Sequence, residues 1–363
     1  MARLRILTLV SVLLSVLVFC LKNRKASTIA AGKGLVVDKS WLSTNKHPLI
    51  PIQDRRPPDQ TFLTYPEWFL VFSPKEQAEY FRQHTSTTFP YMKHVDQLWK
   101  GYDVVYHQIK GNYPFNTGYH VMIMVIGAST TVEYGLKAWY ETVVGRVTDP
   151  GNELTGEDRL DQHYIADYVS FIEDTPWYEY NFNHELKNLW TETSFFGPHF
   201  LRKLERKYFL TTELLVKSGY GWLIKQGTKA SYEPALLNTT VVIDRLPEDL
   251  KSLPQVRNVR QLKNGWYLAD LPRYANFNLA VAGLASQGIV FKEIAGNNSA
   301  IMLTVLTDKP IRASREVKGI FTQPIMTKAG LNRIALVTRV ENLSSVVRSI
   351  KQTGGSIEHI YDY

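Results

Sequence analysis

The chain has 363 residues, of which 44% are apolar and 21% are charged. This composition excludes an intrinsically disordered protein, and the length is enough for two domains that each bury a core. The single cysteine, Cys20, leaves the rest of the chain without disulfides, cysteine-rich zinc sites or a cysteine nucleophile.

The net charge of +8 is unevenly distributed. Residues 1–60 carry ten Lys and Arg against three Asp and Glu, residues 61–231 carry sixteen against twenty, and residues 232–363 carry sixteen against eleven. The excess is therefore greatest near the N-terminus, beside an apolar run, where basic residues meet anionic lipid headgroups. No nucleic-acid partner is expected.

The apolar run covers residues 4–21 and contains one charge, Arg5, and no Gly or Pro. As a helix it would be about 27 Å long, close to the bilayer hydrocarbon thickness of about 30 Å. A cleaved signal peptide is the alternative, but Lys22 follows at once and Phe19 is large where a peptidase requires a small residue. Residues 1–25 are therefore predicted to be a transmembrane anchor whose partner is membrane lipid.

The orientation of this anchor is not fixed by its flanking charges, because basic residues lie on both sides of the run. An N-terminal anchor with a long C-terminal body usually acts as a signal anchor. The expected location is therefore the plasma (inner) membrane with an extracytoplasmic body.

Residues 26–60 are basic and rich in proline, which predicts an extended linker. Residues 61–231 are predicted to form a mainly helical domain. Pro66 is expected to keep residues 62–72 extended or irregular, and Ser73-Pro74 reads as a capped helix start. Pro90 opens a second predicted helix, with apolar residues at three- and four-residue steps.

Residues 118–132 are mostly apolar but too few to span a bilayer comfortably, so a buried core helix is expected. A second or re-entrant membrane segment is the alternative. Thr155 and Asp158 form a capping box for the next helix, and a longer helix is expected from Pro198 to a stop at Gly219.

Residues 232–363 change from helical to strand patterning and are predicted to form an α+β module. Helices are expected near residues 274–287 and 342–354, and residues 308–330 are expected to be an exposed loop. No internal sequence repeat is apparent. The predicted strands are 240–244, 266–271, 289–295, 301–307, 333–340 and a closing strand at 356–363. Their order predicts a ferredoxin-like sandwich with an extra strand.

No familiar nucleophile or nucleotide-binding motif occurs, and no cofactor is predicted. The sharpest polar pattern is a pair of four-residue spacings, Asp103 with His107 and His163 with Asp167, each on one face of a predicted helix. If the helices pack antiparallel, the four side chains could hold zinc or iron. The simpler interpretation is that both pairs are solvated.

Two further charge patterns have alternative interpretations. Residues 149–185 hold ten acids, and a basic block of Arg202, Lys203, Arg206 and Lys207 follows. Either the two are surfaces that neutralise each other, or the basic helix lies on anionic lipid. Glu133 and Lys137 are expected to be a helix-surface ion pair; if residues 118–132 enter the membrane, the pair instead marks the membrane interface.

The sequence as a whole is therefore that of a mixed α+β protein with an N-terminal transmembrane helix. Its predicted function is that of a membrane-anchored binding or assembly module, with a protein partner or self-association. A membrane-surface enzyme with an Asp/His metal centre and a small-molecule sensor with its ligand at the domain junction are the alternatives.

Overall fold

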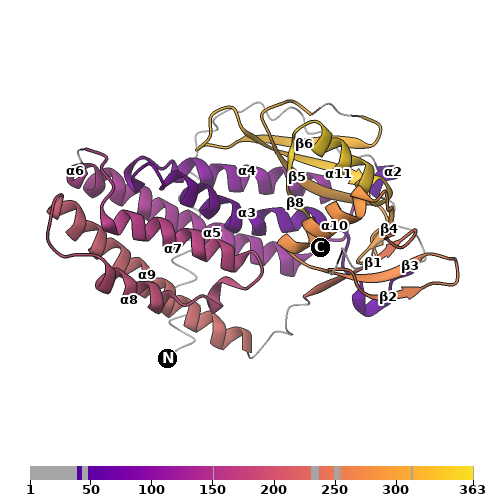
Figure 1. Ribbon diagram of the computed structural model, residues 1–363, viewed down its shortest axis with the longest axis horizontal. Helices are drawn as coiled ribbons and strands as arrows, with labels where there is room; N and C mark the ends of the chain where they lie inside the picture. Colours follow the sequence, from indigo (N-terminus) through magenta and orange to yellow (C-terminus); the bar gives the residue numbers. More distant parts are fainter. Residues whose placement is uncertain are drawn as a thin grey trace.

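A computed structural model describes residues 39–42, 48–149, 151–229, 237–248, 253, 255–311 and 314–362. The protein is mixed α+β, as predicted: helices form one end of the molecule, and two sheets with two helices form the other (Figure 1). The predicted anchor and much of the predicted linker lie outside the described residues. Within them, no helix is both long and apolar enough to cross a membrane.

The helical part consists of long helices joined by short turns, including a π-helical turn at Glu141–Gly145 that links two of them. Its helices are α3 (Gln60–Tyr80), α4 (Tyr91–Ile109), α5 (Thr117–Tyr140), α6 (Arg146–Thr148), α7 (Gly156–Ile172), α8 (Phe182–Glu192) and α9 (Phe200–Lys229). The short helix α2 (Lys39–Leu42) lies beside the sheets (Figure 1). The predicted capping box at the start of α7 is confirmed, with Thr155 and Asp158 bonded to each other's backbone amides.

Helix α3 lies at the centre and packs against α4, α5 and α7. It runs through Pro66 and Pro74, so the predicted extended segment and the predicted helix start at Ser73 are wrong. Each proline removes one backbone hydrogen bond, which normally favours a break. Here most of the helix is buried, and packing on three neighbours outweighs that loss.

Helix α9 also differs from the prediction, since it continues through Gly219 to Lys229. Gly219 does not adopt the left-handed conformation that ends a helix. A glycine inside a helix costs only about 1 kcal/mol relative to alanine. Contacts with α7 and α8 therefore suffice to keep the helix continuous.

The described residues of the C-terminal part form eight strands and two longer helices. The strands are β1 (Asn238–Ile243), β2 (Arg257–Gln261), β3 (Tyr267–Pro272), β4 (Phe291–Ile294), β5 (Ala300–Thr307), β6 (Val317–Pro324), β7 (Asn332–Arg339) and β8 (Ser356–Ile360), and the helices are α10 (Ala275–Ser286) and α11 (Leu343–Gln352). They form two four-stranded antiparallel sheets, ordered β2-β3-β1-β4 and β6-β7-β5-β8.

The two sheets have the same topology. In each, three strands are followed by a helix and a fourth strand, and the first strand lies between the third and the fourth. The predicted single ferredoxin-like sheet is therefore replaced by a duplicated unit that the sequence does not show as a repeat. The strands that the prediction missed, β2 and β6, are equivalent outer strands, and β6 occupies part of the predicted loop 308–330.

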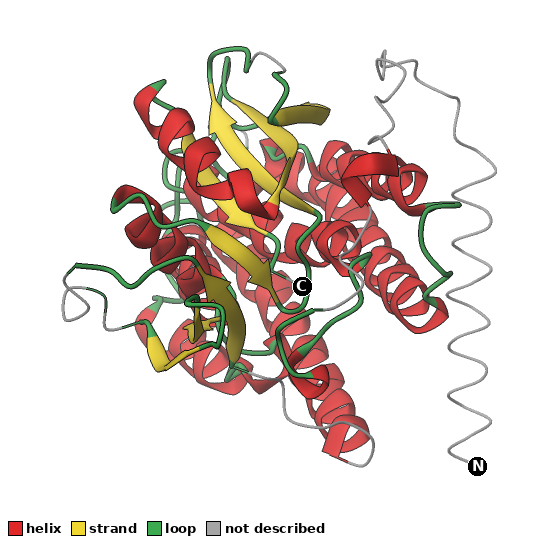
Figure 2. Ribbon diagram, turned by 90° about the vertical axis from the view of Figure 1, so that its right-hand side faces the viewer, coloured by secondary structure: helices red, strands yellow, loops and turns green. Residues whose placement is uncertain are grey.

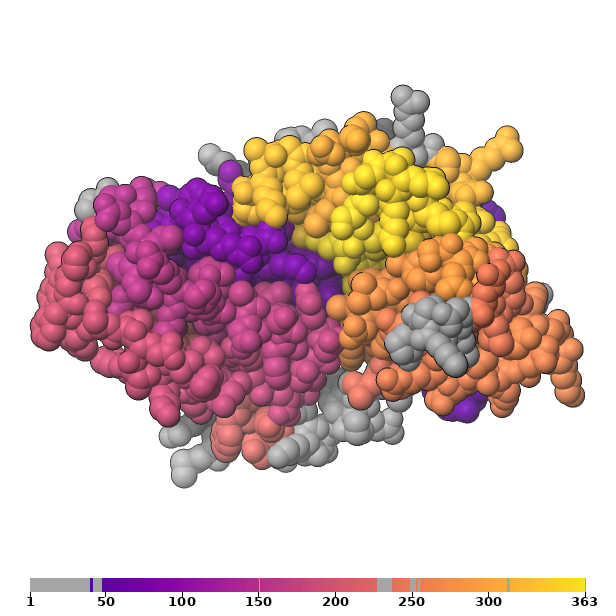
Figure 3. Space-filling view, in the orientation of Figure 1, coloured from indigo at the N-terminus to yellow at the C-terminus, as the bar shows by residue number. Residues whose placement is uncertain are grey.

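The second sheet is covered on both faces (Figure 2). Along β5, Ala300 and Met302 join the core of the helical part, whereas Ile301 and Leu303 join a core shared with α10 and α11. In Figure 3, purple atoms of the helical part lie directly against yellow atoms of this sheet. The helical and α+β parts therefore share one core at their junction.

Residues 48–56 are packed against the first sheet and do not form a free linker. The Glu293 carboxylate on β4 accepts hydrogen bonds from the backbone amides of Leu49 and Ile50, all at 2.9 Å. The amide of Arg56 donates to the carbonyl oxygen of Ala295 at 3.0 Å. This part of the predicted linker 26–60 thus belongs to the folded body.

Candidate functional site

The four predicted metal ligands lie on two helices. Asp103 and His107 are exposed on α4, with 3.6 Å between Oδ1 and Nδ1. His163 is exposed on α7, and Asp167, one turn later, accepts a hydrogen bond from the Tyr180 hydroxyl at 2.8 Å. Among the described residues, no group of three or more His, Cys, Asp or Glu side chains could hold a metal ion. The structure therefore does not bring the two pairs together.

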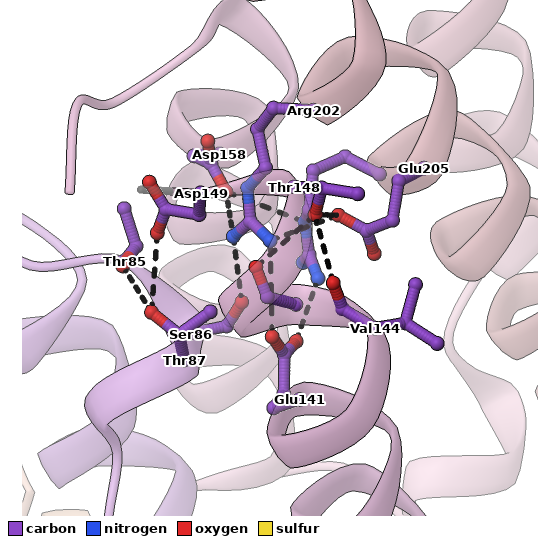
Figure 4. Close-up of polar contacts among 12 residues, drawn as sticks. Thr85, Ser86, Thr87, Glu141, Val144, Thr148, Asp149, Asp158, Arg202 and Glu205 are labelled. Carbon is purple, nitrogen blue, oxygen red and sulfur yellow. Dashed lines mark hydrogen bonds and ion pairs between the residues drawn. The ribbon is translucent and has the colours of Figure 1, made fainter. Parts of the chain in front are cut away.

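The charged residues that the structure does bring together lie inside the helical part. We call the first group the arginine network: Arg202, Arg206 and Glu205 of α9, Asp158 and Asp161 of α7, and Glu141 after α5. Figure 4 shows Arg202 among Glu205, Asp158 and Glu141. Both arginine side chains are only 1% exposed. Two acids of the predicted surface cluster, Asp158 and Asp161, thus meet two arginines of the basic block in the protein interior.

Arg202 and Arg206 each contact several carboxylates. Arg206 lies 2.7 Å from Asp161, 2.9 Å from Glu141 and 3.3 Å from Asp158. Arg202 lies 2.8 Å from Glu205 and 3.0 Å from Asp158, and it also donates to Ser86 of the segment between α3 and α4. The network therefore joins α5, α7 and α9 through two side chains.

The network contains four carboxyl groups against two guanidinium groups, and the pKa values reflect that imbalance. Burial raises the pKa of Asp161 to about 6, although Arg206 opposes the shift. Burial also raises the pKa of Glu205. For Asp158 burial is outweighed by the two arginines, and its pKa is lowered. Asp161 and Glu205 are thus the groups most ready to hold a proton.

A second group, the lysine network, joins α5 to α9. Lys137 lies 2.9 Å from Glu213 and 3.2 Å from Glu133, and Lys217 lies 2.8 Å and 3.2 Å from the same two carboxylates. The predicted ion pair of Glu133 with Lys137 is therefore present, but the Lys137 side chain is only 7% exposed. Although burial opposes it, the two lysines hold the pKa of Glu213 well below its usual range.

A cleft of about 590 Å³ adjoins the arginine network. Glu141 belongs to both, and it lies in the π-helical turn, a distortion often found at functional sites. A Cβ at position 145 would collide with a Glu141 carboxylate oxygen, so a larger residue there would displace that side chain. On the other side, Thr87 donates to Asp149 at 3.1 Å. The cleft offers carboxylate, hydroxyl and basic groups to a small polar molecule.

The outward side of α5 and its continuation is apolar. The exposed apolar side chains recur at three-, four- and seven-residue steps, which places them in one stripe. They are Val121, Met124, Val125, Leu136, Trp139, Val143 and Val147. Of the described charged residues of α5, Glu133 is half-buried and Lys137 is buried.

Helix α9 has the same inverted arrangement. Its described charged side chains are buried or half-buried, whereas Leu201, Tyr208, Leu215 and Trp222, spaced by seven residues, are exposed. The sequence-based alternative of a basic helix surface on lipid is therefore wrong, because Arg202, Lys203, Arg206 and Lys207 are all buried. We call the exposed stripes of α5–α6 and α9 the apolar face.

The two stripes lie on neighbouring helices, since α5 and α9 are joined by the lysine network and by a ring contact of 4.6 Å between Tyr140 and Phe209. In contrast, the outward sides of α4 and α7 carry the polar pairs that include His107 and His163. The inverted arrangement is thus found on α5 and α9 and not on α4 and α7.

Comparison with known proteins finds no matching family model, no matching curated protein and no matching solved structure. The function must therefore be inferred from the chemistry of the chain itself.

Proposed function

We propose that this protein is a membrane-anchored binding or assembly protein. Residues 1–25 serve as its transmembrane anchor in the plasma (inner) membrane, its body is extracytoplasmic, and the apolar face is its contact surface. The partner is membrane lipid, another protein or a second copy of the chain, and not nucleic acid. The observation that carries the proposal is the inverted polarity of α5 and α9.

The physical basis is the cost of leaving such a surface in water. A water-exposed helix directs its apolar stripe toward the core and its charges outward. In α9 the charges point inward and are paired, while large apolar side chains point outward. Monomeric soluble proteins rarely expose contiguous apolar patches of this kind, so the face is expected to be covered in the native state.

The paired interior charges support the same conclusion. Charged groups in membrane-associated bundles face the bundle interior and pair with one another, because the surroundings cannot solvate them. Arg202, Arg206 and Lys217 follow that pattern, with every one contacting at least two carboxylates. The arrangement is favourable for a body held against an apolar medium or partner.

A labelling experiment on the full chain in its native membranes tests this proposal. In a Cys20→Ser background, Leu215→Cys places one thiol on the apolar face, and Ser170→Cys places one on the exposed polar side of α7. A membrane-impermeant, bulky maleimide should label position 170 readily and position 215 at least about tenfold more slowly. If position 215 is labelled at the same rate before and after detergent extraction, the apolar face is not covered and the proposal is refuted.

A further inference from the structure

We propose that the partner of the apolar face is the lipid bilayer itself, with α5 and α9 lying side-on at the boundary between headgroups and acyl chains. This inference rests on the proposed function and names the partner of its contact surface. It does not require either helix to cross the membrane.

The first reason is that, apart from the exposed Arg146 of α6, the face offers few free hydrogen-bonding groups. Thr142 and Thr212, the exposed hydroxyl residues beside its stripes, donate to carbonyl oxygens one turn earlier on their own helices, at 2.7 and 2.9 Å. Ser129 of α5 likewise donates to the carbonyl of Ile126 at 2.9 Å. These hydroxyls thus satisfy themselves locally and need neither water nor a partner.

The second reason is that a protein partner would need what this face lacks. Protein interfaces carry about one hydrogen bond per 100–200 Å², together with a polar rim that fixes their register. Between residues 200 and 226 of α9, the exposed polar side chains are Thr212 and Gln226, apart from the aromatic Tyr208, Tyr220 and Trp222. Contact with lipid needs neither hydrogen bonds nor a polar rim, because acyl chains require only an apolar surface of sufficient area.

The third reason is the chemistry of the aromatic residues on the face. Trp139, Tyr208 and Trp222 are each more than 60% exposed, next to aliphatic side chains such as Leu136 and Leu215. Indole and phenol rings are enriched where acyl chains meet headgroups, because one part of the ring is apolar and another can hydrogen-bond. The mixture therefore fits the interfacial zone better than the centre of a bilayer.

The connection to the predicted anchor is long enough for both elements to reach one bilayer. Fourteen residue steps separate Lys25 from Lys39, where the described chain begins with α2. Fully extended, they reach about 48 Å. Helix α9, at 30 residues, is about 45 Å long, so an anchor and a side-on helix of this length can share the same membrane surface.

The test uses the purified full chain reconstituted into phosphatidylcholine vesicles. The single-thiol variants Leu136→Cys and Leu215→Cys, with Ser170→Cys as the matched control, carry a polarity-sensitive nitrobenzoxadiazole fluorophore. Emission at the two face positions should shift to the blue relative to position 170. Lipids that carry a nitroxide on the acyl chain should quench the emission intensity at the two face positions by at least about twofold. The intensity at position 170 should stay unchanged.

The outcomes separate this inference from the proposed function. Blue-shifted emission that nitroxide lipids do not quench would mean that protein covers the face; the lipid inference would then be overturned and the contact surface retained. Emission at positions 136 and 215 like that of position 170, with no quenching, would mean that the face meets water, and both would fail. A circular-dichroism spectrum identical to that of the parent protein confirms that each variant is folded.

Discussion

Arg206→Ala is the sharpest test of the interior charges. The substitution removes one guanidinium from within 2.7–3.3 Å of three carboxylates and leaves those acids buried. Asp158 keeps its contact with Arg202, whereas Asp161 keeps no arginine within ion-pair distance. Removing one partner of a buried ion pair costs about 3–5 kcal/mol, and we expect a loss of unfolding free energy in that range.

The loss should depend on pH in a definite direction. Burial already raises the pKa of Asp161 to about 6, and the absence of Arg206 raises it further. A carboxyl group whose folded-state pKa is raised favours the folded state only while it is protonated. The variant should therefore be closer to the parent protein in stability at about pH 5.5 than at about pH 8.

Chemical denaturation of the full chain in detergent micelles measures both effects. Arg159→Ala is the matched control, because Arg159 is exposed on α7, and we expect it to change stability by no more than about 0.5 kcal/mol. If Arg206→Ala costs no more than Arg159→Ala, or if its cost is the same at both pH values, the arginine network is not a stabilising assembly.

Three further predictions follow from packing and charge. Burial raises the pKa of Glu76 to about 7, so its stabilising contribution should be lost as the pH rises from about 4.5 through 7, and Glu76→Gln should flatten that part of the denaturation-midpoint profile. Gly127→Ala should lower the melting temperature, because the added Cβ would lie 2.7 Å from the Trp99 ring. On the same helix, a Cβ at position 135 would have no atom within 4 Å, so Gly135→Ala should be neutral or stabilising. A fragment of residues 232–363 should show no cooperative melting by circular dichroism, because one face of its second sheet packs into the helical part; a sharp transition would contradict the shared core.

Local signals in the sequence predicted most of the elements correctly. The capping box at Thr155 marks the start of α7, and six strands and both helices of the C-terminal part lie close to their predicted places. The errors occur where tertiary contacts override a local preference. Pro66 and Gly219 are helix-breaking residues on local grounds, yet both lie inside helices that packing keeps continuous.

The missed strands have a different cause. Strand β2 reads Arg-Asn-Val-Arg-Gln and is almost wholly exposed, so it lacks the apolar alternation that identifies a strand. It is an outer strand, which needs only one hydrogen-bonded neighbour and tolerates charged residues on its surface. Its equivalent β6 contains Gly319 and an irregular register, which weakens the pattern further.

The candidate site could be predicted only in part. The acids of residues 149–185 and the basic block are predicted as possible partners, and Asp158 and Asp161 do pair with Arg202 and Arg206, although in the interior and not at the surface. The sequence alone could not decide which side of α9 faces inward, because the helix has one charged and one apolar side. That choice depends on Glu141 and Asp161, which lie on other helices and are distant in sequence.

The attachment of residues 48–56 to β4 has a mechanical consequence. The Glu293 carboxylate accepts hydrogen bonds from the backbone amides of Leu49 and Ile50. The backbone amide of Arg56 donates to the carbonyl of Ala295, just after β4, before the chain enters α3. Nearer the N-terminus, the Trp41 ring of α2 lies 4.6 Å from the ammonium group of Lys318 on β6. Tension applied from the N-terminal side would therefore reach the two sheets through these contacts before it reached α3. The α+β part, although it comes last in the sequence, would be the first part of the body to bear such a load.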